Sequence, residues 1–160
     1  MIKLLRVWLI FGALSMFSQT KAVFPVTYSF EQAYNLQQKN DKPIFVFVYT
    51  DWCKFCHAMK KKVFTSKRIA KILNESFYFV LLNAEDKKEI VIQDKVFKYR
   101  ANGYKTGVHE LAEALATKKG KLTYPTTVFL SKTNVIDEQI VGFIPVEELN
   151  DLLESYLKRF

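Results

Sequence analysis

The sequence predicts a single α/β domain in which one β-sheet carries helices on both faces. Two short runs, residues 44–49 (IFVFVY) and 77–82 (FYFVLL), are apolar throughout and rich in β-branched and aromatic side chains. Such runs are typical of strands that are buried on both faces. Segments with helical spacing of apolar residues lie before the first run, between the two runs and at the end of the chain. The expected order is therefore β-α-β followed by β-β-α.

The first helix is predicted from a capping box, Ser29-Phe30-Glu31-Gln32. In such a box, the serine hydroxyl and the glutamine side chain each accept a hydrogen bond from the other residue's free backbone N–H group. We expect this helix to run to about Asn40, because Asp41-Lys42-Pro43 breaks it. Another helix begins near Ser66, between the two buried strands.

The second half of the chain continues with shorter elements. Residues 89–99 predict a hairpin that turns at 93–95, and residues 109–117 predict a helix that Gly120 stops. Two strands and a closing helix follow, at residues 126–130, at residues 138–142 and from Pro145 onward.

The N-terminus has the pattern of a secretory signal peptide. Lys3 and Arg6 precede an eleven-residue apolar run, residues 7–17, which is short for a membrane span. Thr20 and Ala22 supply the small residues that a signal peptidase recognises. We expect cleavage after Ala22 and one domain over residues 23–160. An uncleaved N-terminal anchor is the alternative, and it would be the chain's only contact with a membrane.

Composition narrows the function classes further. Residues 23–160 contain 21 Lys and Arg and 16 Asp and Glu. Their formal charge is +5, and the basic residues are spread along the chain. No aromatic residues alternate with a basic stripe, so the sequence does not favour a nucleic-acid partner. The chain has two cysteines, three positions apart, and a bridge between them closes too small a loop to add much stability. The pair therefore points to chemistry.

The stretch "DWCKFCH", residues 51–57, supports more than one chemistry. Cys53-Lys54-Phe55-Cys56 is a C-x-x-C dithiol, and with His57 it is also the attachment signature of a c-type haem. Haem normally needs a second axial ligand, and Met59 lies too close in sequence to reach the opposite face. We therefore expect no haem or other cofactor.

A metal site is a further alternative. Cys53, Cys56, His57 and His109 are the four soft ligands that tetrahedral zinc would use, and a thiolate pair can also carry copper. His109 stands alone in the sequence, without the paired spacing of a zinc site. The sequence thus predicts no metal.

The dithiol interpretation accounts for more of the sequence. Cys53 falls where a strand ends and a helix begins, so the positive end of the helix dipole favours its thiolate. Lys54 and a protonated His57 would act in the same direction, although His57 is equally consistent with an exposed helix residue. Cys56, one turn on, is placed to attack a mixed disulfide formed at Cys53. We expect Cys53 to be exposed and Cys56 to be partly buried.

These residues resemble the thioredoxin family. Asp51-Trp52-Cys53-x-x-Cys56 after an apolar strand is similar to that family's active site, and Tyr124-Pro125-Thr126 is similar to its cis-proline loop. The stretch "CKFCHAMKKKVF" resembles an exported group that includes the C-terminal domain of transmembrane thiol–disulfide interchange proteins. The resemblance implies a thioredoxin fold with a central mixed sheet.

The resemblance also implies a role for each site residue. Cys53 would be the nucleophile and Cys56 the resolving cysteine, with Trp52 beside the site. Pro125, in the cis form, would shape substrate docking together with Tyr124. Tyr104 is a further candidate for a substrate groove.

Three departures from the family pattern stand out. The family's buried aspartate, six residues before the first cysteine, is Phe47 here, which leaves Asp51, His57 and Glu85 as candidate proton acceptors. Lys-Phe replaces Gly-Pro between the cysteines. Residues 84–122 are longer than the family's connection, and we expect an inserted hairpin and helix there that serves as a docking surface.

The sequence thus predicts an exported thiol–disulfide oxidoreductase that acts on protein substrates. The resemblance implies the bacterial periplasm as its location. The resemblance favours reduction, with a membrane thiol reductase as a possible source of electrons. The alternative from another class is a non-catalytic binding module of the same fold that holds a partner through residues 84–122.

Overall fold

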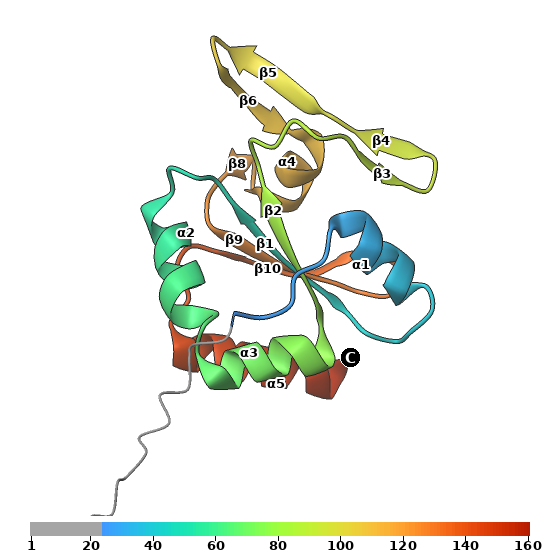
Figure 1. The fold of residues 1–160 in the computed structure, drawn as a ribbon, viewed down its shortest axis with the longest axis vertical. Coiled ribbons are helices and arrows are strands. Elements are labelled where there is room, and N and C mark those ends of the chain that lie inside the picture. Colours follow the sequence, from blue (N-terminus) through green and yellow to red (C-terminus); the bar gives the residue numbers. More distant parts are fainter. Residues whose placement is uncertain (1–23) are drawn as a thin grey trace, which may run out of the picture.

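The computed structural model describes residues 24–160, whose centre is a four-stranded mixed sheet in the order β10-β9-β1-β2 (Figure 1). The two apolar runs form β1 (Ile44–Tyr49) and β2 (Tyr78–Asn83), which pair in parallel. β9 (Thr126–Leu130) pairs antiparallel to β1, and β10 (Ile136–Val141) pairs antiparallel to β9. The predicted mixed sheet is confirmed, with each predicted strand within two residues of its observed bounds.

Helices cover both faces of this sheet. One layer contains α1 (Phe30–Gln37) and α4 (Glu110–Ala116), and the other contains α2, α3 (Lys67–Ser76) and α5 (Val146–Arg159) (Figure 1). α2 (Lys54–Ala58) continues into a single π-helical segment, η1 (Met59–Val63), that the sequence pattern did not predict. Within residues 24–160, none of these helices is both long and apolar enough to cross a bilayer.

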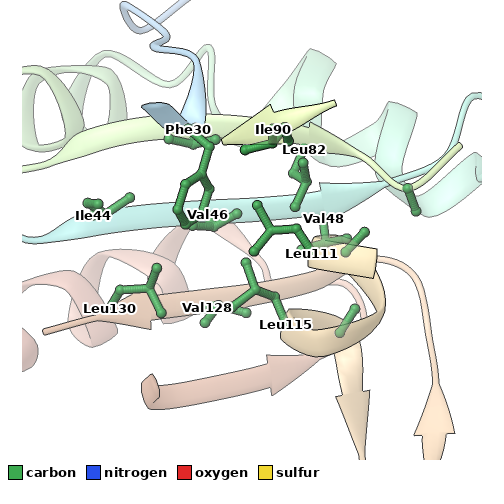
Figure 2. Packing of buried hydrophobic residues seen from close by; sticks show 14 of the residues in the cluster. Phe30, Ile44, Val46, Val48, Leu82, Ile90, Leu111, Leu115, Val128 and Leu130 are labelled. Carbon is green, nitrogen blue, oxygen red and sulfur yellow. The ribbon is translucent and has the colours of Figure 1, made fainter. Parts of the chain in front are cut away.

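Side-chain alternation along β1 divides the core into two halves. Val46 and Val48 point to the α1 and α4 side, where Figure 2 shows them packed with Phe30 and Leu111. Phe45 and Phe47, which alternate with these valines in β1, point to the α2, α3 and α5 side, among further aromatic rings. Burying each large apolar side chain contributes about 1.5–3 kcal/mol. This second half of the core also contains both cysteines, so it anchors the candidate site.

Residues 84–122 form more structure than the sequence indicated. The predicted hairpin is confirmed as β3 (Ile90–Ile92) with β4 (Lys95–Phe97). A second hairpin, β5 (Tyr99–Gly103) with β6 (Thr106–His109), was not predicted, because its largely exposed strands lack an apolar alternation. Figure 1 shows both hairpins beyond α4, at the end of the molecule away from α3 and α5.

The helix in this region ends differently from the prediction. α4 stops at Ala116, and Thr117 already has extended backbone angles. Gly120 instead lies in the turn of a short hairpin of β7 (Thr117–Lys118) and β8 (Lys121–Leu122). The two turn residues, Lys119 and Gly120, both have positive φ. The prediction that Gly120 ends the helix was wrong, because the strand pairing begins before the glycine is reached.

The first helix confirms its predicted capping box. The backbone N–H of Gln32 donates to the Ser29 hydroxyl, and the backbone N–H of Ser29 donates to Gln32 Oε1, at 3.1 and 2.9 Å. The helix is shorter than expected and ends at Gln37. The predicted signal peptide, residues 1–22, lies outside the described residues.

The capping box gives a direct stability test with a matched control. We expect Ser29→Ala to lower the free energy of unfolding by about 1 kcal/mol, because it leaves a helix N–H without its acceptor. Ser66 also caps a helix, α3, but its side chain makes no capping hydrogen bond. Ser66→Ala should therefore cost clearly less in urea unfolding. Equal costs would show that the box does not stabilise α1.

Candidate active site

The site forms where β1 ends and α2 begins. After Tyr49 the chain turns through Thr50, Asp51 and Trp52, and the Cys53 N–H donates to the Thr50 carbonyl at 3.3 Å. Cys53 is the N-cap of α2, with an extended backbone, and its sulfur accepts a hydrogen bond from the Cys56 N–H at 3.1 Å. The local sequence thus brings a cysteine to a helix N-terminus, as predicted.

Cys53 and Cys56 form a disulfide, with their Cα atoms 5.2 Å apart. Cys53 was expected to be exposed, yet only 5 % of its surface is accessible, and Cys56 has none. The prediction for Cys53 was wrong because the bridged pair packs into the apolar cluster that includes Phe47 and Met59. Of the two sulfur-bearing residues, Cys53 is still the more accessible, so an incoming molecule meets it first.

The rings of Trp52 and Tyr124 form an aromatic wall beside the dithiol. Trp52 is exposed, and its ring meets the ring of Tyr124 edge to face, with centroids 6.0 Å apart. The Trp52 indole Nε1–H donates to Glu85 Oε1 at 2.9 Å. This hydrogen bond fixes the tryptophan beside the cysteines and was not apparent from the sequence, because Glu85 lies 33 residues further along the chain.

The proline loop lies at the same end of the sheet. The Tyr124–Pro125 peptide bond is cis, and the Pro125 carbonyl accepts from the Gly142 N–H at 2.8 Å. β9 begins directly after this loop, and its residue Thr126 pairs with Val48 near the end of β1. The fold therefore places Tyr124 and Pro125 at the same end of the sheet as the dithiol, and their role in substrate docking stays a prediction.

Lys54 and His57 lie on the exposed side of α2. The His57 Nε2 atom is 2.6 Å from the Asp51 carbonyl oxygen. Because a carbonyl oxygen can only accept, Nε2 carries the hydrogen, and the neutral ring has its free lone pair on Nδ1. A role for these two side chains in tuning the Cys53 thiolate stays a prediction.

The position of the family's buried aspartate is apolar in this chain. Phe47 is fully buried and packs edge to face on Phe64, with ring centroids 4.9 Å apart. Of the other candidate proton acceptors, Asp51 accepts from the Asn83 side chain at 3.1 Å, and Glu85 holds Trp52. Both carboxylates therefore lie at the rim of the site and have hydrogen-bond partners there.

Two buried hydroxyls near the site were missed by the sequence analysis. Thr50 and Thr127 are inaccessible, and within residues 24–160 neither Oγ1 atom has a hydrogen-bond partner. Thr127 pairs with Phe47 across β9 and β1, so its side chain is on the dithiol face of the sheet. A threonine in a strand looks like an ordinary β-former, and only the assembled fold reveals an unpaired hydroxyl.

Two other predicted residues lie away from the dithiol. Tyr104 is 89 % exposed, in the turn of the β5–β6 hairpin. His109 was expected at the surface or as a cap, and it is a fully buried N-cap of α4. Its Nδ1 accepts from the Leu111 N–H, and its Nε2 lies 3.1 Å from the Lys88 carbonyl. Both ring nitrogens of His109 thus have hydrogen-bond partners within this segment and are not available to bind a metal together with the cysteines. Residues 24–160 contain no group of three or more potential metal ligands.

Burial beside Trp52 perturbs the acidity of Tyr124. Desolvation, together with the negative charges of Glu85 and Glu113, raises the pKa of Tyr124 to about 12 from 10.0. Because the folded-state pKa is the higher one, this group contributes stability that is complete below pH 10 and is lost as the pH rises to about 12.

This shift predicts a measurable titration. In the difference between the 295 nm absorbance of the native protein and that of its Tyr124→Phe variant, we expect a midpoint near pH 12. A midpoint near the ordinary value of 10.0 would contradict the buried environment described for this side chain.

Known proteins match this chain over different lengths. A family described as thioredoxin-like domain matches residues 30–157. Spermatogenesis-associated protein 20 of Mus musculus is 33% identical over 67 residues, which are 42% of this chain and 8% of that protein. An uncharacterized protein of Caenorhabditis elegans is also 33% identical over 67 residues, 42% of this chain and 9% of the other. The chain therefore matches less than a tenth of these long relatives.

Solved structures share the fold at low sequence identity. A DsbH oxidoreductase superposes with a TM-score of 0.60 at 17% identity, covering 91% of this chain and 92% of the other. A putative disulphide-isomerase from Bacteroides thetaiotaomicron gives a TM-score of 0.58 at 21% identity, with 86% and 94% covered. The C-terminal domain of DsbD from Neisseria meningitidis, in its oxidised form, gives 0.53 at 14% identity, with 77% and 88% covered.

Proposed function

Because this chain belongs to the thioredoxin-like domain family, we propose that it is an exported protein that exchanges thiols and disulfides on protein substrates through Cys53 and Cys56. The observation that carries the proposal is a bridged C-x-x-C pair at the N-terminus of α2, at the same end of the sheet as a cis-proline loop. A bridge over three positions adds little stability, so its presence at this end of the sheet favours redox chemistry.

The reaction is a two-electron exchange. In the reducing direction, the Cys53 thiolate attacks one sulfur of a substrate disulfide, and the other substrate sulfur leaves as a thiolate. The Cys56 thiolate then attacks the Cys53 sulfur of this mixed disulfide. The second substrate thiolate leaves, and the Cys53–Cys56 disulfide forms. The substrate gains two electrons that the dithiol loses, and an external dithiol must restore them.

The accessibility of the two cysteines supports a different role for each sulfur in this exchange. Cys53 is the more accessible residue and sits at the positive end of the α2 dipole, which stabilises a thiolate. Cys56 is inaccessible, so it reaches Cys53 but not a second large molecule. We therefore assign attack on the substrate to Cys53 and resolution to Cys56.

Direction and location are further parts of the proposal. We favour reduction, with a membrane thiol reductase as the electron donor, by resemblance to the thiol–disulfide interchange group. The cationic Lys54 beside the thiolate stabilises the dithiol form and works against a very low potential. The basic and apolar pattern of residues 1–22 supports export to an oxidising compartment such as the periplasm.

Insulin reduction tests the proposed activity. With dithiothreitol as the electron source, the protein should accelerate the precipitation of reduced insulin chains above the uncatalysed rate. A non-catalytic binding module would leave that rate unchanged. A redox titration of the dithiol in glutathione buffers then places its potential against those of known reductants and oxidants, which decides the favoured direction.

A further inference from the structure

A groove lies between the β5–β6 hairpin and the aromatic wall of the site. Its volume is about 370 Å³. Thr50, Trp52, Glu85 and Tyr124 line it from the domain core, while Thr106 and Val108 line it from β6. Because Trp52 precedes Cys53 and Tyr124 precedes Pro125, the groove adjoins the dithiol and the cis-proline loop. A polypeptide bound at the dithiol would therefore place a nearby side chain at this groove.

The groove contains a carboxylate whose hydrogen-bonding capacity is not saturated. Trp52 uses one carboxylate oxygen of Glu85, at 2.9 Å. Within residues 24–160, no ion pair includes Glu85. A carboxylate has two acceptor oxygens, so Glu85 can accept further hydrogen bonds from a ligand.

The charge and the walls of the groove favour a cation. Glu85 is the one charged side chain among its lining residues. Two cations from adjoining segments are engaged elsewhere, since Arg100 pairs with Glu110 and Glu113 and Lys87 lies over the Tyr99 ring. The rings of Trp52 and Tyr124 provide faces on which a planar guanidinium can stack.

We propose that this groove is a specificity subsite that takes an arginine side chain of the protein substrate, close in sequence to the cysteine under attack. The inference rests on the proposed thiol–disulfide exchange. Arginine fits better than lysine because its planar fork of N–H donors matches the Glu85 carboxylate, and because its plane stacks on aromatic rings.

A set of disulfide peptides tests this subsite on the full chain in its reduced form. Each peptide carries a fluorophore and a quencher joined through one disulfide, so reduction is read directly as kcat/KM. The peptides differ at one residue within two positions of the attacked cysteine, which is arginine, lysine, glutamate or citrulline. Citrulline has the shape of arginine without its charge.

We expect the arginine peptide to exceed the citrulline peptide by about tenfold in kcat/KM at the best position, which corresponds to about 1.4 kcal/mol. Lysine should fall between them, and glutamate should be lowest. General attraction to this basic chain would instead favour the glutamate peptide, so it cannot produce the expected order. Equal rates for all peptides would overturn the subsite and leave the exchange activity standing. If no peptide is reduced, the proposed function itself is wrong.

A matched pair of variants assigns the preference to the groove. Glu85→Gln should bring the ratio of the arginine and citrulline rates close to one, whatever happens to the absolute rates. Glu75→Gln, which makes the same change on the exposed side of α3, should keep the full ratio. A preference for arginine that survives Glu85→Gln would place its origin outside the groove and overturn the inference.

Discussion

Replacing Cys53 by serine is expected to reduce insulin turnover to the uncatalysed background, because no other sulfur in the described domain is positioned to attack a substrate. Cys56→Ser should also stop multiple turnover, but for a different reason. Cys53 can still attack, and the missing resolving thiol leaves the substrate attached to it. The two variants therefore have the same steady-state defect and differ in what they accumulate.

Alkylation distinguishes the reactivities of the two thiols in the unsubstituted protein. Near pH 6, iodoacetamide should label Cys53 of the reduced protein first, because Cys53 lies at the helix N-terminus and is the less buried residue. Peptide mapping after a short reaction gives the order. Prior labelling of Cys56 would reverse the assigned roles and would mean that the reduced site differs from the bridged one.

The largest stability effect is expected at Phe64, which lies just after η1 in the core half beneath the dithiol. Its ring packs on those of Phe47 and Phe79, with centroids 4.9 and 5.0 Å away, and the side chain is fully buried. Phe64→Ala should lower the free energy of unfolding by about 3–5 kcal/mol, through lost apolar contacts and a residual cavity. Because small domains have about 5–15 kcal/mol in total, this is a severe loss.

The natural control for this substitution is Phe55, which lies between the two cysteines and is 65 % exposed. Phe55→Ala should change the free energy of unfolding by less than about 0.5 kcal/mol. If Phe64→Ala does not fold, Phe64→Leu should still show a measurable loss in urea unfolding. A Phe64→Ala cost no greater than that of Phe55→Ala would contradict the packing of this half of the core.

The parts of the fold that were predictable are those governed by local chemistry. β1 and β2 are short apolar runs between turn residues, and such runs have few alternatives inside a compact domain. The Ser29 capping box needs only neighbours within the same turn. The dithiol was predicted as a helix start for the same reason, since a strand, a short turn and a helix follow one another in the sequence.

The parts that were missed depend on contacts between distant segments. The β5–β6 hairpin is held by a turn with positive φ at Lys105 and by pairing whose side chains are largely exposed, so no apolar pattern marks it. Cys53 belongs to a buried cluster that also contains side chains of η1 and α5, so its burial was not apparent from the neighbouring residues alone. Glu85 was predicted only as a candidate proton acceptor, and its place in a groove became apparent only from the position of the β5–β6 hairpin.

The most direct test of the central claim is the intact mass of Cys56→Ser after reaction with oxidised insulin. We predict a covalent adduct between one insulin chain and the protein, located at Cys53 by peptide mapping and released by dithiothreitol. Cys53→Ser, treated in the same way, should form no such adduct. An adduct on Cys53→Ser, or none on Cys56→Ser, would contradict the assignment of Cys53 as the attacking sulfur of a thiol–disulfide oxidoreductase.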